Sequence, residues 1–101
     1  MVPSRDKVLQ IIKTHRSYLQ TEYGVEKIGL FGSIATGMAD ADSDIDLVIQ
    51  FNKPIGFRFY ELVEYLEKIF NRKVDVLTPD GIESIRNKTI SSNIKRTATY
   101  V

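Results

Sequence analysis

The chain has 101 residues, and 14 Lys and Arg against 13 Asp and Glu leave a net charge of only +1 at pH 7. This balance lacks the basic excess of a protein that grips a long stretch of nucleic-acid backbone. With no Cys and one His, the chain cannot form disulfides or thiolate metal sites, and a histidine-based metal centre is disfavoured. Any metal ion is therefore expected on oxygen ligands, in a single domain that spans residues 1–101.

Neither a membrane span nor a secretory signal is expected. The longest uncharged stretch, residues 28–39, has twelve residues and includes three Gly. A membrane-spanning helix needs about 20 predominantly apolar residues. The N-terminus runs directly into charged sequence without an apolar segment. The expected location is the cytoplasm.

The first half of the chain begins with a helical pattern. Ser4 is a suitable N-cap, and apolar residues at helical spacing predict a first helix that ends near Gly24. The apolar run over residues 27–31 predicts a buried strand. A Gly-Ser pair follows it directly and predicts a tight turn into a short helix at residues 34–38.

The second half of the chain also alternates between predicted strands and helices. Period-two apolar spacing over residues 44–51 predicts a second strand, and residues 59–70 carry the apolar stripe of a long helix. Residues 73–78 predict a third strand, and residues 82–101 a final, weak helix. This order predicts an α/β (α+β) sandwich, in which periodicity alone leaves the strand directions open.

Three carboxylates stand at positions that could share one cation. Asp44 and Asp46 are two apart in a predicted strand, so both side chains leave the same face, about 6.5 to 7 Å apart. Asp75 can join them from a neighbouring strand. Such carboxylates repel one another by about 4 kcal/mol per pair at 4 Å and an effective dielectric near 20. The cluster therefore calls for Mg²⁺ or Mn²⁺, and these ions complete their shells with water and substrate phosphates, as in a nucleoside triphosphate.

The Gly-Ser pair supplies the complementary phosphate site. Gly32 and Ser33 stand where a strand meets a helix start, and there backbone N–H groups, a hydroxyl and the helix dipole favour phosphate. The chain has neither Gly-x-x-x-x-Gly-Lys-Ser/Thr nor Gly-x-Gly-x-x-Gly. A P-loop and a dinucleotide-binding fingerprint are therefore both excluded.

Together these features resemble the minimal nucleotidyltransferase family of the polymerase-β-like superfamily. Its members carry a Gly-Ser pair, ten residues, and then Asp-x-Asp. Here the pair is followed by ten residues, 34–43, and then by Asp-Ile-Asp. The likeness runs from about Lys27 to the C-terminus and includes the third-strand segment 74–80. One departure is Thr36, where many relatives place an Arg.

The resemblance implies the fold, the cofactor and the roles of the site residues. It implies a small mixed β-sheet of about three to four strands flanked by helices. Asp44, Asp46 and Asp75 would be catalytic and would hold two Mg²⁺ ions, while Gly32 and Ser33 would bind the nucleotide. An acceptor hydroxyl would attack the α-phosphorus of ATP in line, and pyrophosphate would leave.

The resemblance also implies a partner. Many stand-alone members of this family are antitoxins that pair with a small helical HEPN-domain ribonuclease toxin and move AMP from ATP onto a tyrosine of that toxin. The leading hypothesis is therefore a Mg²⁺-dependent protein adenylyltransferase of this antitoxin type, working in a hetero-oligomer. It would belong to a toxin–antitoxin system and act by protein adenylylation.

Other interpretations stay open. The chain could neutralise its partner by binding alone, or transfer nucleotides to a small molecule or an RNA end with help from a partner subunit. An isolated Asp-x-Asp is most often ordinary turn chemistry. His15, in the apolar stripe of the first helix, is interpreted as structural. A solvated helix face is the simplest reading of the C-terminal cations, Arg86, Lys88, Lys95 and Arg96.

Overall fold

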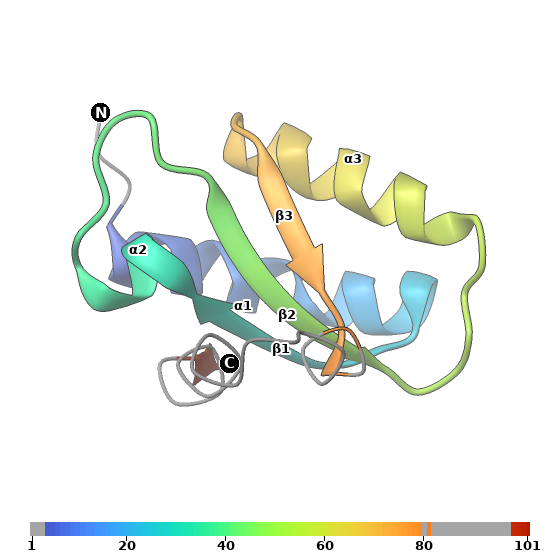
Figure 1. Cartoon of the computed structure of the whole chain (residues 1–101). Helices are drawn as coiled ribbons and strands as arrows, with labels where there is room; N and C mark the ends of the chain where they lie inside the picture. The colour runs from blue at the N-terminus through green and yellow to red at the C-terminus, as the bar shows by residue number, and fades with distance from the viewer. Residues whose placement is uncertain (1–3, 80, 82–97) are drawn as a thin grey trace.

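The computed structural model describes residues 4–79, 81 and 98–101. Helices and strands alternate along these residues (Figure 1). None of the described helices is long and apolar enough to cross a membrane. The elements in chain order are α1 (Arg5–Tyr23), β1 (Val25–Phe31), α2 (Gly32–Thr36), β2 (Ile45–Phe51), α3 (Arg58–Phe70), β3 (Val74–Leu77) and β4 (Thr99–Tyr100).

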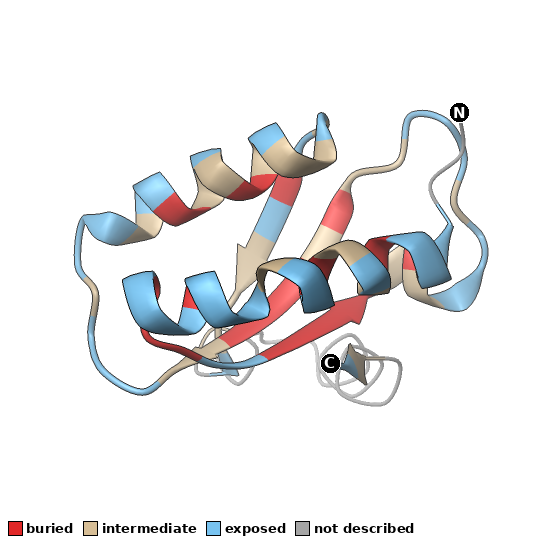
Figure 2. Cartoon of the chain, turned by 180° about the vertical axis from the view of Figure 1, so that it is seen from behind, coloured by how far each residue is buried: buried red, intermediate tan, exposed pale blue. Residues whose placement is uncertain are grey.

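The strands form one mixed sheet in the order β3-β2-β1-β4. β1 runs antiparallel to both β2 and β4, whereas β2 and β3 are parallel and are connected through α3. Helices α1 and α3 lie on one side of the sheet, behind it in Figure 1 and in front of it in Figure 2. The predicted small mixed sheet flanked by helices is therefore confirmed.

The main core lies between the sheet and the two long helices, where Figure 2 shows the buried residues. Alternate residues of β2 point into it, as the period-two pattern predicts. Each fully buried aliphatic side chain contributes roughly 1.5 to 3 kcal/mol relative to an exposed one. The most buried aliphatic side chains of this core are Ile12, Leu19, Ile28, Leu30, Ile34, Ile45, Leu47, Ile49, Leu62 and Leu66.

Both ends of α1 confirm the sequence prediction. The Ser4 hydroxyl oxygen accepts a hydrogen bond from the backbone N–H of Lys7 at 3.2 Å, as an N-cap does. Gly24 ends the helix with φ +69°, and its N–H donates to the carbonyl of Gln20 at 3.0 Å. These caps fix where α1 ends and β1 begins.

A second, smaller apolar cluster lies apart from the main core. Phe31 and Val48 are buried in it, and Leu77 and Ala98 pack against them. Val48 stands between Leu47 and Ile49, which belong to the main core, so it points to the other side of β2. The face of the sheet away from α1 and α3 therefore has an apolar patch of its own.

The prediction for the C-terminal segment is wrong at its end. Thr99–Tyr100 form strand β4 on the edge of β1 instead of helix, and the N–H of Val101 donates to the Ile28 carbonyl at 3.0 Å. A β-branched and an aromatic residue favour a strand, and β1 offers backbone groups to pair with. The rest of that prediction, with the four C-terminal cations, lies outside the described residues.

Two shorter elements are shifted against their predictions. Helix α2 begins directly at Gly32 rather than at residue 34, and it ends at Thr36 because Gly37 adopts φ +79°. Strand β1 begins at Val25, two residues before the predicted start. The order of elements along the chain is unaffected.

Candidate functional site

Two of the three predicted carboxylates, Asp46 and Asp75, meet at one end of the sheet. Asp46, near the start of β2, is paired with Phe31 at the end of β1 and with Asp75 in β3. Residues directly opposite each other on neighbouring strands have side chains on the same face, roughly 5 Å apart. The parallel pairing of β2 with β3 therefore brings Asp46 and Asp75 together, as the sequence predicted.

Gly32 lies directly against the Asp46 carboxylate. A Cβ at Gly32 would overlap Oδ2 of Asp46 and come within 3.1 Å of its Cγ. Gly32 also adopts φ +77°, a conformation that favours glycine. Both steric facts require glycine here. The start of α2, where a phosphate was predicted to bind, thus touches the carboxylate predicted to hold its counter-ion.

Ser33 continues from Gly32 into the first turn of α2, and both residues are half-buried. The residue at the N-cap is Phe31, which provides no capping hydrogen bond from its side chain. The first N–H groups of a helix have no partner within the helix. At this turn they are free of side-chain capping and lie beside the carboxylates.

Asp44 lies in the loop that leads into β2. Upstream, the Asp40 N–H donates to Ser43 Oγ at 2.9 Å, and the Asp42 N–H donates to Asp40 Oδ1 at 2.9 Å. These bonds form the kind of turn that Asp and Ser favour. The polar residues between the Gly-Ser pair and Asp44 therefore give the loop a defined shape.

Arg72, just past the end of α3, holds the same loop from the other side. Its guanidinium donates to the Ser43 carbonyl at 2.6 Å and to the Ala41 carbonyl at 3.4 Å. Next to it, the Ile45 N–H donates to the Lys73 carbonyl at 3.1 Å. The sequence alone indicated no role for Arg72 at this site. The signal that the sequence offered for this role is a basic residue between the long helix and the strand that carries Asp75.

The electrostatics of the site centre on Asp46. Burial, and then the neighbouring charges of Asp75 and Asp44, raise the pKa of Asp46 from its ordinary 3.8 to about 6. Within the part of the chain that the structure describes, no three acidic or histidine side chains are already drawn together at metal-binding distance. The donor set nevertheless fits a divalent cation, because carboxylate oxygens are hard ligands and a cation would offset the repulsion between Asp46 and its acidic neighbours.

Thr36 and His15 both have structural hydrogen bonds. The Thr36 hydroxyl donates back to the carbonyls of Gly32 and Ser33, at 3.3 Å each. His15 Nδ1 lies 2.9 Å from the Tyr65 hydroxyl between α1 and α3. The expectation that His15 is a satisfied structural residue is confirmed. At position 36 a short hydroxyl therefore bonds back to the first turn of α2.

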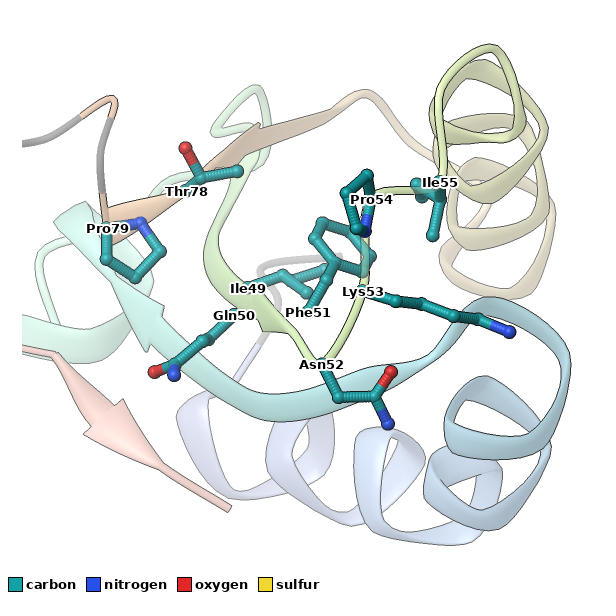
Figure 3. Close-up of a pocket in the computed structure, with 9 residues that line it drawn as sticks. All are labelled: Ile49, Gln50, Phe51, Asn52, Lys53, Pro54, Ile55, Thr78 and Pro79. Carbon is teal, nitrogen blue, oxygen red and sulfur yellow. The ribbon is translucent and has the colours of Figure 1, made fainter.

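A separate hollow of about 530 Å³ opens at the other end of β2 and β3 (Figure 3). It contains none of the predicted site residues, because it gathers residues from the ends of these strands, whereas Asp46 and Asp75 lie near their beginnings. The hollow is lined by Ile49, Gln50, Phe51, Asn52, Lys53, Pro54, Ile55, Thr78 and Pro79.

Comparison with known proteins agrees with this arrangement. The sequence model of the nucleotidyltransferase domain matches residues 12–101. The candidate protein adenylyltransferase MJ1379 of Methanocaldococcus jannaschii is 38% identical over 98 residues, which cover 94% of this chain and 95% of the relative. The protein adenylyltransferase MntA of Thermococcus cleftensis is 35% identical over 86 residues, covering 84% and 87%.

Solved structures share the fold. A candidate minimal nucleotidyltransferase superposes with a TM-score of 0.75 at 23% identity, over 96% of this chain and 95% of that one. A toxin–antitoxin crystal structure with AMP-PNP gives 0.63 at 17% identity, over 97% of this chain and 72% of that one. At these identities the likeness is one of fold.

Proposed function

The chain belongs to the nucleotidyltransferase family, and from that membership we propose that it is a protein adenylyltransferase, which moves AMP from ATP onto a partner protein. The observation that carries this proposal is the Asp46–Asp75 pair, which lies beside Gly32 at one end of the sheet. That arrangement puts carboxylates next to uncapped backbone N–H groups, as a bound nucleoside triphosphate and its cations require.

Asp44, Asp46 and Asp75 are the residues that would hold divalent cations, with Mg²⁺ the expected ion. When bound, such ions neutralise the triphosphate and lower the pKa of an attacking hydroxyl. The carboxylates fit this role because their mutual repulsion disfavours the empty, fully ionised cluster. Oxygen ligands without His or Cys suit this hard cation.

The chain's own residues would bind and orient the triphosphate. Backbone N–H groups at Gly32 and Ser33 would bind its oxygens, and the absence of a Cβ at Gly32 lets the phosphate approach the backbone. The acceptor oxygen would form a bond to the α-phosphorus while the bond from that phosphorus to pyrophosphate breaks. Asp75, the exposed carboxylate, would accept the hydroxyl proton.

The proposed acceptor is a tyrosine of a helical HEPN-domain ribonuclease toxin, which would make this chain the antitoxin of the pair. Two observations support this assignment. Relatives that match most of the chain are named protein adenylyltransferases. Structures with the same fold include toxin–antitoxin complexes, among them the MntA–HepT pair. ATP and Mg²⁺ are abundant in the cytoplasm, so we place the reaction there.

The test is the mass of the partner. The chain is purified with its native partner, incubated with Mg²⁺ and ATP, and the partner's intact mass is measured. We expect wild type to add AMP and Asp44→Asn to add none. Asp42 is an exposed carboxylate in the same loop, so Asp42→Asn is the matched control and should behave as wild type.

Two outcomes would contradict the proposal. A partner that binds tightly but stays unmodified under every condition would indicate an antitoxin that acts by binding alone. AMP found on a small alcohol or an RNA end, with none on the partner, would indicate a different acceptor. Either result would change the proposed acceptor and leave the family membership unchanged.

A further inference from the structure

The face of the sheet away from α1 and α3 carries more than carboxylates. The strand register pairs Phe31 with Asp46 and Gly29 with Val48, and on its other side pairs Gly29 with Tyr100 of β4. Directly paired residues share a face. Asp46, Val48 and Tyr100 therefore all lie on this one face, with an apolar patch next to the charged end.

Gly29 determines where the Tyr100 ring lies. A Cβ at Gly29 would come within 3.0 Å of Val48 Cγ1 and within 3.1 Å of both Cδ1 and Cε1 of Tyr100. The ring therefore extends from the edge strand across the backbone of β1 toward β2. Only a residue without a side chain leaves this space open, so Gly29 makes room for the ring.

Much of the ring is still open to solvent. Tyr100 is 57% exposed, although one edge of its ring covers Gly29. A tyrosine that only covered a glycine would gain most by burying its ring fully. An exposed aromatic ring held in place along one edge is typical of the platforms on which nucleobases stack.

The spacing fits one nucleotide. Asp46 and Val48 are two residues apart on the same face of β2, about 6.7 Å along the strand. Tyr100 is paired with Gly29, which is itself paired with Val48, so the ring lies on the face of the carboxylates, two residues further along the strand direction than Asp46. An α-phosphate bound at Asp46 would leave the attached base within reach of the ring.

We propose that Tyr100 is the platform on which the base of the nucleotide substrate stacks. The proposal rests on the proposed function, because it places the base by the site where the phosphates would bind. Aromatic stacking tolerates every base, since each has a π-face. Tyr100 therefore selects for nucleoside triphosphates as a class, over inorganic polyphosphates.

The experiment compares two triphosphate ligands, one with a nucleobase and one without. Calorimetric titration in Mg²⁺ measures binding of α,β-methylene ATP, which cannot donate AMP, and of inorganic tripolyphosphate. The variants are Tyr100→Leu, which keeps apolar cover over Gly29, and Tyr100→Phe, which keeps the ring. Tyr60→Leu, an exposed tyrosine on α3, is the matched control.

We expect Tyr100→Leu to bind the nucleotide roughly 5- to 100-fold more weakly and to bind tripolyphosphate as wild type does. Tyr100→Phe and Tyr60→Leu should bind both ligands as wild type does. Thermal unfolding of each variant reports whether the fold is intact. The selective loss is a signature that a purely structural role of the ring would not produce.

Several results would overturn the assignment. If Tyr100→Leu binds the nucleotide as tightly as wild type does, Tyr100 is not a stacking platform. Continued AMP transfer by that variant would leave the proposed function intact. If Tyr100→Leu binds both ligands more weakly to the same extent, the ring maintains the shape of the site and does not contact the base. AMP found on Tyr100 itself after incubation with Mg²⁺ and ATP would make its hydroxyl an acceptor. If wild type binds neither ligand, the platform and the proposed function fail together.

Discussion

The two faces of the sheet use the same strand for different purposes. On the helix side, Ile45, Leu47 and Ile49 of β2 are almost fully buried. On the other side, Asp46 is only half-buried, with a pKa raised to about 6. The helix-covered face provides stability, whereas the opposite face retains carboxylates whose repulsion costs stability. Substitutions on the two faces of β2 should therefore affect stability with opposite signs.

The largest expected effect is on activity, at Asp46. Asp46→Asn should lower the rate of AMP transfer by roughly 10²- to 10³-fold, as expected when one group that stabilises transition-state charge is removed. The rate is measured as AMP incorporated into the partner at saturating Mg²⁺ and ATP. Asp42→Asn serves again as the control. An Asp46→Asn rate within a few-fold of wild type would refute a role for this face in catalysis.

On the helix side, Leu47→Ala should cost about 2 to 5 kcal/mol of unfolding free energy. Leu47 is fully buried, so the substitution leaves a cavity in the main core. Urea denaturation measures the loss. The specific activity of the remaining folded protein should stay close to that of wild type, because Leu47 points away from the carboxylates. A stability loss below about 0.5 kcal/mol would contradict the packing described for this face.

Gly32→Ala tests the junction between β1 and the carboxylates. The new Cβ would overlap the Asp46 carboxylate and sit at a positive φ, so we expect a loss of about 1 to 3 kcal/mol together with reduced nucleotide binding. Gly37→Ala is a matched control, because Gly37 has φ +79° with no atom within 4 Å of a new Cβ. Equal effects of both substitutions would show that backbone strain alone matters at Gly32.

The raised pKa of Asp46 makes stability depend on pH. The folded state holds this proton up to about pH 6, whereas the unfolded chain releases it near 3.8. The contribution is thus fully present below pH 3.8 and is lost as the pH rises through 6. After screening by solvent it amounts to about 1 to 2 kcal/mol. Urea midpoints from pH 4 to 7.5 should show this loss in wild type but not in Asp46→Asn.

The smallest expected effect is at Arg72, which acts through the loop before Asp44. Arg72→Gln weakens its hydrogen bonds to the Ser43 and Ala41 carbonyls, so we expect a loss of about 1 kcal/mol and a several-fold lower rate of AMP transfer. Arg72→Lys should recover part of the rate. A rate unchanged in Arg72→Gln would show that the loop keeps Asp44 in place without this residue.

The sequence was sufficient where local patterns decide the structure. Ser4 and Gly24 are found as the predicted caps of α1, and period two separates Asp46 from its buried neighbours. The spacing between the Gly-Ser pair and the Asp pair also predicted which family the chain belongs to. Each of these signals needs only a few neighbouring residues.

Contacts between residues far apart in the sequence could not be predicted from such local patterns. Thr99 and Tyr100 form a strand because the edge of β1 accepts them, although they are about 70 residues away in the sequence. Arg72 contacts the loop before Asp44 across 29 residues. Both contacts depend on the assembled sheet, which composition and periodicity do not describe.

The most direct test of the central claim is the mass of the native partner after incubation with Mg²⁺ and ATP, measured side by side for wild type and Asp46→Asn. We predict that wild type adds AMP to a tyrosine of the partner and that Asp46→Asn, folded and at least as stable at pH 7, adds it roughly 10²- to 10³-fold more slowly. Equal modification by both proteins, or by neither, would contradict adenylyl transfer by the carboxylate face of this sheet.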